Sequence, residues 1–310
     1  MKSLSRRFLF NPAHLVFFLV GLIFLLTGIS AISEEISNAP PAPLDSSLHA
    51  ETSADETNGA GVIFEEPLVN GMSPHVSLPE PDDCLEPSDR EVLPRIAIII
   101  DDMGHHKKMG GELLDLDLNL TFSFLPHAPF TQEQEQRAWQ MSRDILVHMP
   151  MEPRDSSFNP GPGTLYLKDS AEIRNQFVEQ NILRVPHAIG VNNHMGSKFT
   201  SNRRAMHEVM SVLKEKGLFF VDSLTTSSSV GASEARNMGV RTGRRSIFLD
   251  NSQTQEDICR QLKRLVTYAK KNGTGIGIGH PNRATVNALK SCKELLQQQV
   301  RIVGVRELMK

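Results

Sequence analysis

The sequence predicts an α/β fold built on a parallel sheet, and three observations carry this prediction. Residues Ile96–Ile100 form an apolar run without alternation, which is typical of a strand buried on both faces. Similar short runs alternate with longer helical patterns along the rest of the chain. Two carboxylates, Asp101 and Asp102, follow the first run, at the strand end beyond which ligands of parallel sheets bind. The sheet is expected to be open or closed into a barrel.

Short apolar runs bounded by polar or glycine residues supply the other strands. The first run, Ile96–Ile100, is rich in β-branched residues, which favour strands. The further strands are expected at Leu120–Leu125, Asp144–His148, Ala188–Val191, Gly217–Val221, Ser246–Leu249, Thr274–Gly279 and Val300–Val303.

Helices are expected where apolar residues recur at helical spacing, as Ile173, Phe177 and Ile182 do. One pattern stops at Asn272 and Gly273, a pair that commonly ends a helix in the left-handed conformation. The helices are expected at Lys107–Asp115, Gln132–Arg143, Asp169–Arg184, Arg203–Lys216, Glu256–Lys271 and Ala284–Gln299.

The N-terminus has the pattern of an export signal. Three basic residues within the first seven positions precede eighteen uncharged residues, 15–32. That length just spans a bilayer, and the basic flank directs the remainder of the chain across it. We expect residues 1–33 to form an uncleaved signal anchor, because Gly-Ile-Ser-Ala at 28–31 is a mediocre cleavage site. The alternative is a cleaved signal peptide and a secreted protein. In both cases the remainder is extracytoplasmic, on the periplasmic side.

Residues 34–91 are expected to form an acidic, disordered tether. They contain nine Glu and five Asp against one Arg, with Pro and Ser clusters and no regular period. Since the whole chain carries −3 and residues 1–33 carry +3, the tether carries −13 and residues 92–310 carry +7. The segment 92–310 is long enough for one globular domain. Its modest basic balance is not clustered with aromatic residues, so no nucleic-acid partner is expected.

The three cysteines, Cys84, Cys259 and Cys292, have no metal-binding spacing. Cys84 lies in the tether, and the other two lie in helical patterns, where buried free cysteines are common. A disulfide between Cys259 and Cys292 would require an oxidising compartment. The sequence leaves both states open.

Polar residues follow nearly every predicted strand. Each has an ordinary explanation when taken alone, as a hydrogen-bonded structural histidine or a helix-capping aspartate. Their collection at one end of one sheet favours a functional site. Carboxylates with imidazoles form a ligand set suited to zinc or another divalent transition ion. The candidate residues are Asp101, Asp102, His148, Glu152, Asn193, His194, Asp222, Ser223, Asp250 and His280.

From about Pro94 to Lys310 the chain resembles the divergent polysaccharide deacetylases, relatives of the NodB-type carbohydrate esterases. The resemblance rests on the order and spacing of IDDMG at 100–104, HMPMEP at 148–153, NNHMGS at 192–197, FVDS at 220–223, FLDN at 248–251 and GHP at 279–281. It implies a distorted seven-stranded (β/α) barrel of NodB-like deacetylase type, with a metal ion at its C-terminal mouth. It further implies Asp101 as catalytic base, Asp102 as metal ligand and His280 as catalytic acid.

Two departures from the NodB pattern are evident. The family's His-x-x-x-His motif reads His148-x-x-x-Glu152 here, so the second metal imidazole is expected from His194. Glu152 is then a substitute ligand or a carboxylate that faces substrate. The family's Arg-x-Pro motif is not evident at its usual place. A similar sequence, Arg184–Pro186, lies at a different place in the order of motifs.

The activity implied by the resemblance is metal-dependent hydrolysis of N-acetyl groups on aminosugars of an envelope polysaccharide or peptidoglycan-like glycan. Asp102, His148 and His194 are expected to hold a divalent metal ion, with zinc as the first candidate.

The remaining site residues are assigned to proton transfer and substrate contact. Asp101 is expected to take a proton from water, and His280 to protonate the departing amine. Asp222 is expected to orient His280 or a ligand imidazole. Contacts with substrate are expected from Glu152, Asn193, Ser223 and Asp250.

The alternative function is a catalytically inactive deacetylase-like domain that binds glycan or an envelope protein. The altered His-x-x-x-Glu motif and the expected membrane anchor both permit it. Sugar platforms normally use Trp or Tyr, and residues 92–310 contain only Trp139, Tyr166 and Tyr268. The scarcity of these residues argues against a long sugar-binding groove. Replacement of Asp101 separates the alternatives, since loss of function with metal retained indicates catalysis.

Other patterns carry weaker signals. The segment Gly273–Gly279 lacks GxGxxG and a P-loop lysine, so its glycines indicate a strand close to its neighbours rather than a nucleotide site. His105 and His106 could ligate the metal, but their position on the turn after the first strand favours solvated side chains or a place behind the metal ligands. His127 and His187 are expected to be structural or surface residues.

Overall fold

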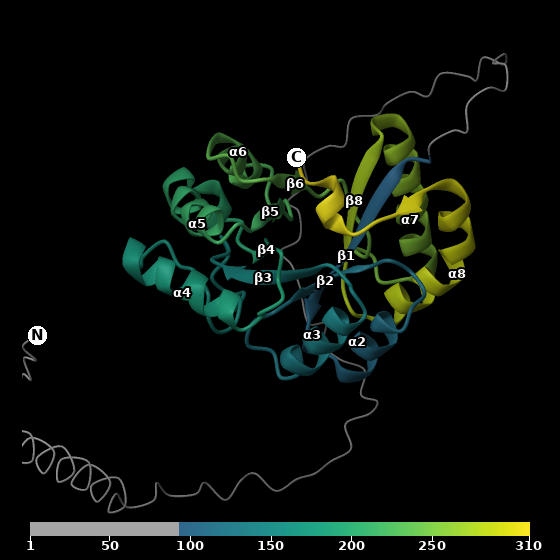
Figure 1. Ribbon diagram of the computed structural model, residues 1–310, viewed down its shortest axis with the longest axis horizontal. Helices are drawn as coiled ribbons and strands as arrows, with labels where there is room; N and C mark the ends of the chain where they lie inside the picture. The colour runs from purple at the N-terminus through teal and green to yellow at the C-terminus, as the bar shows by residue number, and fades with distance from the viewer. Residues whose placement is uncertain (1–92) are drawn as a thin grey trace, which may run out of the picture. The chain divides into compact units, whose positions relative to one another are not determined.

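The computed structural model describes residues 93–310, and a single curled sheet organises them (Figure 1). The expected signal segment 1–33, the tether 34–91 and Cys84 lie outside the described residues. Within the described part of the chain, no helix has both the length and the apolar character needed to cross a membrane.

The described residues contain nine strands in one sheet, and every pairing between them is parallel. Their bounds are β1 Arg95–Met103, β2 Thr121–Phe124, β3 Ile145–Met151, β4 Gly190–Met195, β5 Phe219–Asp222, β6 Thr242–Arg244, β7 Ile247–Phe248, β8 Thr274–Gly279 and β9 Arg301–Ile302. The order across the sheet is β6-β5-β4-β3-β2-β1-β8-β7, and β9 also pairs with β1.

The two edges of this sheet meet through one short piece of chain. Only Arg245 and Ser246 separate β6 at one edge from β7 at the other. The Arg245 amide donates to Asp222 O on β5, and the Ser246 amide donates to Ile276 O on β8. When residues 242–248 count as one strand position, the barrel has seven: β1 to β5, this segment and β8. The predicted distorted seven-stranded (β/α) barrel is confirmed.

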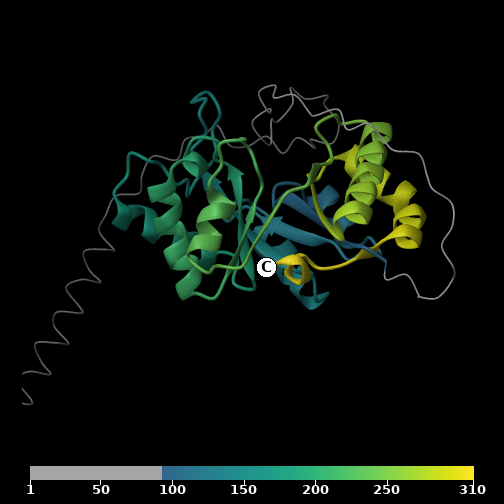
Figure 2. The same cartoon turned by 90° about the horizontal axis from the view of Figure 1, so that it is seen from above.

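Helices cover the outside of the curled sheet. Figure 2 shows the teal and green helices on one side of it and the yellow-green and yellow helices on the other. Ser170, Asn202, Thr254 and Asn282 cap the N-termini of four helices by accepting a backbone N–H three residues on. The helices are α2 Lys107–Leu114, α3 Thr131–Gln140, α4 Ala171–Leu183, α5 Arg203–Glu215, α6 Gly231–Asn237, α7 Gln255–Asn272 and α8 Arg283–Gln299, with short 3₁₀ turns at Phe199–Ser201 and Val305–Leu308.

Strand β1 is buried on both faces, as its uninterrupted apolar run predicts. Ile96, Ile98 and Ile100 belong to the larger apolar cluster, which includes residues of the surrounding helices. Ala97 and Ile99 belong to a smaller cluster, built with strand residues such as Leu146, Phe219, Val221, Ile276 and Ile278. Because successive strand residues point to opposite faces, the smaller cluster fills the barrel and the larger one joins sheet to helices. Full burial of one such side chain stabilises the fold by about 1.5–3 kcal/mol.

Two short elements, α6 and β6, were not predicted. The seven-residue helix α6 has no side-chain cap at Val230 and follows a segment rich in Ser and Thr, and β6 spans three residues. Conversely, β3 and β4 extend beyond their predicted ends, to Met151 and Met195. His194, expected after its strand, therefore lies on β4, and His148, expected as the last residue of its strand, lies within β3.

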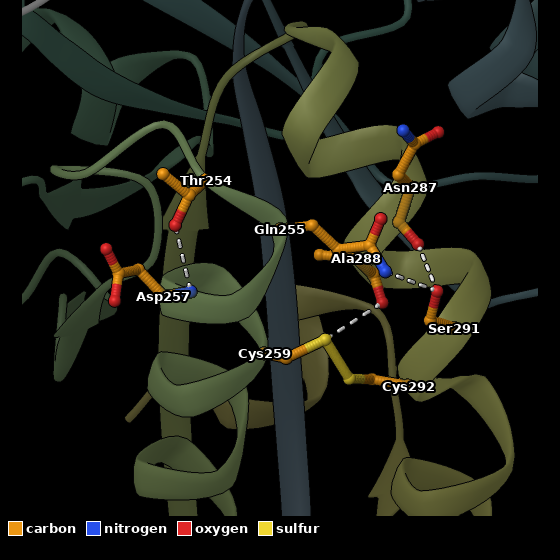
Figure 3. Close-up of a disulfide and its surroundings, with 8 residues drawn as sticks. All are labelled: Thr254, Gln255, Asp257, Cys259, Asn287, Ala288, Ser291 and Cys292. Atoms are coloured by element: carbon orange, nitrogen blue, oxygen red, sulfur yellow. Dashed lines mark hydrogen bonds between the residues drawn. A yellow bond between two sulfur atoms is a disulfide. The ribbon is translucent and has the colours of Figure 1, made fainter.

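A disulfide joins Cys259 of α7 to Cys292 of α8, with a Cα–Cα distance of 6.3 Å (Figure 3). It lies beside the start of α7, where Thr254 accepts the Asp257 amide, and Cys259 Sγ is 3.7 Å from Ala288 O. The state that the sequence left open is thus a disulfide that ties two neighbouring helices together.

Candidate metal centre

A bulge at the end of β1 turns two consecutive carboxylates toward one site. Between two successive register pairs, β1 has one residue more than β2. Asp102 adopts the left-handed conformation, with φ 51°, which is strained for a residue other than glycine and is often found at functional sites. As a result both side chains reach His148: Asp101 Oδ2 lies 3.7 Å and Asp102 Oδ1 3.2 Å from its Nε2.

Three side chains, one each from β1, β3 and β4, form a triangle of donor atoms. Asp102 Oδ1 is 3.0 Å from His194 Nδ1 and 3.2 Å from His148 Nε2, and the two imidazole nitrogens are 3.2 Å apart. All three side chains are buried. The sequence predicted these three residues as the metal ligands, and the fold brings them together.

The triangle has the dimensions of a metal site. Zinc binds nitrogen and oxygen donors at about 2.0–2.2 Å, so donors around one ion stand about 2.8–3.6 Å apart. The three separations above fall within that range. Both oxygens of Asp102 are buried, and within residues 93–310 neither accepts a well-formed hydrogen bond. A buried carboxylate in this state is costly unless a cation joins it, so the donor set fits a divalent ion.

The carboxyl group of Asp102 is held in its charged form. Burial, the largest single influence, raises its pKa. The neighbouring imidazoles of His194 and His148 together outweigh burial and hold the pKa of Asp102 well below its ordinary value. A metal-binding carboxylate must be deprotonated, and this environment favours that state.

Asn192 connects the triangle to Asp101. Its Oδ1 accepts hydrogen bonds from His148 Nδ1 at 2.9 Å and from Ser123 Oγ at 2.5 Å. Its Nδ2 donates to Asp101 Oδ1 at 2.8 Å and to Ser223 Oγ at 3.2 Å. Asn192 was not among the predicted site residues, because only its register pairing with His148 reveals this role.

His280 leaves β8 beside the end of β1, since Ile100 is the register partner of Gly279. Its Nδ1 is 3.0 Å from Asp250 Oδ1, and its backbone amide donates to Asp250 Oδ2 at 2.7 Å. Asn282 and Thr285 donate to the same oxygen. Asp250 therefore fixes the His280 ring with a buried, fully engaged carboxylate.

This arrangement corrects two expected roles. Asp222, expected to orient His280 or a ligand imidazole, instead accepts hydrogen bonds from the Leu224 and Ala232 amides and from Ser229 Oγ. It shapes the loop that leads into α6. Asp250, expected to contact sugar, takes the place beside His280, because β7 is a neighbour of β8 and β5 is not.

Three further candidates are engaged in local structure. Glu152 accepts the Leu167 amide at 2.8 Å and pairs with Lys198 at 2.6 Å, so it pins a loop and is not among the metal donors. Asn193 accepts the Ser223 amide and donates to Met195 O, and both Asn193 and Ser223 are fully buried. Substrate contact by these three residues stays a prediction.

A cavity of about 430 Å³ opens over the triangle, with Asp102 and His194 in its wall. Burial and the nearby His105 lower the pKa of His106, while Asp102 opposes them. His127, expected to be structural, bonds Asn181 Oδ1 through Nε2 at 3.1 Å. Three imidazoles and several prolines thus line the space where a substrate would meet the metal donors: His105, His106, His127, Pro126, Pro150, Pro160 and Pro162.

Comparison with protein families agrees with this geometry. Residues 98–309 match the model of a family described as divergent polysaccharide deacetylase. The match begins in β1 and ends one residue after the last 3₁₀ turn, so it includes every residue of the donor triangle.

Individual relatives cover the same region. An uncharacterized protein of Haemophilus influenzae is 39% identical over 216 residues, which is 69% of this chain and 76% of the relative. The Escherichia coli protein YibQ, also described as uncharacterized, is 34% identical over 215 residues, which is 69% of this chain and 67% of YibQ. The crystal structure of an uncharacterized protein from Agrobacterium tumefaciens C58 has a TM-score of 0.68 at 26% identity, covering 72% of this chain and 92% of that one.

Proposed function

The chain belongs to the divergent polysaccharide deacetylase family, and from that premise we propose that it is a metal-dependent hydrolase of N-acetylated aminosugars. Its substrate in this proposal is an envelope polysaccharide or a peptidoglycan-like glycan. The observation that carries the proposal is the donor triangle, with the Asp101 carboxylate directly beside it.

Asp102, His148 and His194 would hold the divalent ion, and zinc suits their mixed carboxylate and imidazole character. When bound, such an ion lowers the pKa of a coordinated water and polarises the acetamide carbonyl. The chain's own contribution is to fix the donors. Asn192 Oδ1 accepts a hydrogen bond from Nδ1 of His148, which turns Nε2 toward the triangle.

Two groups would move the protons of amide hydrolysis. Asp101 would accept a proton from the attacking water, with Asn192 holding its Oδ1 and leaving Oδ2 toward the triangle. His280 would deliver a proton to the departing amine, with Asp250 fixing the ring through Nδ1. This division gives one carboxylate the role of base and one imidazole the role of acid.

We place this activity outside the cytoplasm. In this proposal residues 1–33 anchor the chain in the membrane, residues 34–91 tether it, and residues 92–310 form the catalytic domain. The Cys259–Cys292 disulfide supports the location, because such bonds persist in oxidising compartments.

The test is acetate release from chitotetraose and from peptidoglycan fragments by the zinc-loaded full-length chain. The proposal expects release by wild type and a loss of about 10²–10⁴-fold in Asp101→Asn with its metal retained. A folded, metal-loaded wild type that releases no acetate from either substrate would favour a catalytically inactive, glycan- or protein-binding domain.

A further inference from the structure

The chain's only tryptophan forms a surface site away from the metal centre. Trp139 lies in α3 and is 50% exposed. Its indole stacks on the His187 ring, with centroids 4.3 Å apart and an angle of 20° between the planes. A large aromatic side chain exposed to this extent leaves apolar surface in water, which calls for an explanation.

A buried carboxylate holds this stack in place. Glu135 Oε1 accepts hydrogen bonds from both the backbone amide and the Nδ1 of His187, each at 2.9 Å. Glu135 is only 2% exposed, and a carboxylate at that depth costs free energy unless it is hydrogen-bonded. The imidazole is therefore fixed from within the fold. The stacked rings of His187 and Trp139 form a rigid aromatic plate.

A hollow of about 570 Å³ adjoins this plate, and most of its wall is polar. An aromatic plate beside amide, hydroxyl and charged groups suits a pyranose, whose C–H face stacks on the ring while its hydroxyls form hydrogen bonds. An anchor site for a protein side chain would instead have an apolar lining around the aromatic residue. The polar wall is built by Asn119, Ser142, Arg143, Arg306 and Glu307.

The hollow lies at the opposite end of the barrel from the metal donors. Asn119, Asp144 and Ile189 line it, and each stands one or two residues before the start of a strand. The five residue-to-residue steps from Ile189 to His194, along β4, span about 16 Å at about 3.3 Å per residue. A ligand on Trp139 is therefore remote from the donor triangle.

We propose that Trp139, His187 and the adjoining hollow form an accessory binding site for a hexopyranose chain. The site holds the protein on a glycan whether or not the metal centre is occupied. It does not depend on the proposed hydrolytic activity, since no residue of the donor triangle belongs to it.

Because the chain has one tryptophan, its fluorescence reports on this site directly. The full-length Asp101→Asn chain is titrated with chitotetraose and with cellotetraose, so that hydrolysis does not consume the probe. The proposal expects at least one probe to cause a saturating change in Trp139 emission. In His187→Ala, which loses the support of the plate, binding weakens about three- to tenfold. Tyr268→Ala, which removes another exposed aromatic residue, on α7, leaves binding unchanged.

Calorimetry with Trp139→Phe provides a second, independent measurement. A smaller ring keeps weakened binding, whereas heat equal to that of wild type assigns the bound sugar to another site and overturns the proposal. No change in emission and no heat with either probe at millimolar concentration also overturns it, and leaves this surface to a protein partner. Acetate release by Trp139→Phe is expected to equal that of wild type, so failure here and failure of the hydrolytic function are distinguishable.

Discussion

Asn192 and His148 are register partners on β4 and β3, and they share a hydrogen bond of 2.9 Å between Oδ1 and Nδ1. Because a carbonyl oxygen can only accept, His148 carries a proton on Nδ1 and turns Nε2 toward Asp102 and His194. The same amide donates to Asp101 Oδ1 at 2.8 Å. One neutral side chain thus orients both a metal ligand and the proposed base.

Replacing this amide should weaken metal binding. Asn192→Ala is expected to reduce zinc affinity about 10–100-fold, because His148 loses the partner that fixes its ring. Competition with a chelator of known affinity measures the change. Asn193→Ala is the matched control, since Asn193 is equally buried but bonds to Met195 and Ser223 instead. Equal zinc affinities in the two variants would contradict the assigned role.

The partner of His280 can be identified by comparing two aspartates. Asp250→Asn is expected to lower kcat about 10–100-fold, because the His280 ring loses its carboxylate while the metal donors are untouched. Asp222→Asn should reduce the melting temperature and change kcat by less than about threefold, since that side chain supports only its own loop. The assignment fails if Asp222→Asn has the larger effect on kcat. Metal content of both variants serves as the control.

The disulfide should contribute measurably to stability. Cys259 and Cys292 are 33 residues apart, and closing a loop of that length stabilises a fold by about 3–4 kcal/mol in the chain-entropy model. Urea unfolding of wild type with and without dithiothreitol measures this contribution. The double variant Cys259→Ser with Cys292→Ser should match the reduced wild type and not respond to the reductant. A wild type that is unaffected by reduction would show that the bond does not form or does not stabilise the fold.

A surface ion pair between helices should make a pH-dependent contribution to the stability of the fold. Arg283, through its hydrogen bonds, and Lys290 lower the pKa of Glu112 from 4.5 to about 2. Since the folded pKa is the lower one, the pair stabilises the fold above pH 4.5, and this contribution disappears as the pH falls toward 2. The melting temperature of Glu112→Gln should therefore lie below that of wild type at pH 6, and the two should converge near pH 2.

A variant of an acid that lacks such partners controls for this comparison. Glu294 lies on the same helix as Lys290, is exposed and makes no ion pair among the described residues. Glu294→Gln should follow the wild-type curve at all pH values. Added salt should reduce the Glu112 effect, because the pair is exposed to solvent. A gap between wild type and Glu112→Gln that persists at pH 2 would contradict the assigned cause.

Much of the fold could be predicted from the sequence, because the pattern of apolar residues indicates which segments are buried. The apolar run Ile96–Ile100 predicted a strand buried on both faces, and β1 has that environment. Helices with good caps, such as the one that follows Thr254, were placed within one or two residues. The short elements α6 and β6 were missed because neither has a cap or a period long enough to be recognised.

The aspartates and histidines of the candidate site could be predicted from the sequence, but which of them contact one another could not. Asp102, His148 and His194 stood out through their residue types at strand ends. The pairing of His280 with Asp250 depends on which strands are neighbours across the sheet, and local sequence does not contain that information. Asn192 was not predicted for a related reason, because a neutral amide acquires its role only from the residue opposite it in the register.

The measurement that tests the central claim most directly is the metal content of the purified full-length chain, wild type against His148→Ala and His194→Ala. Elemental analysis by mass spectrometry is made after exposure to zinc and removal of excess ion, with circular dichroism to confirm folding. The donor triangle predicts about one ion per chain in wild type and loss of that ion in both variants. A wild type without metal, or folded variants that both retain it, would contradict the proposed centre.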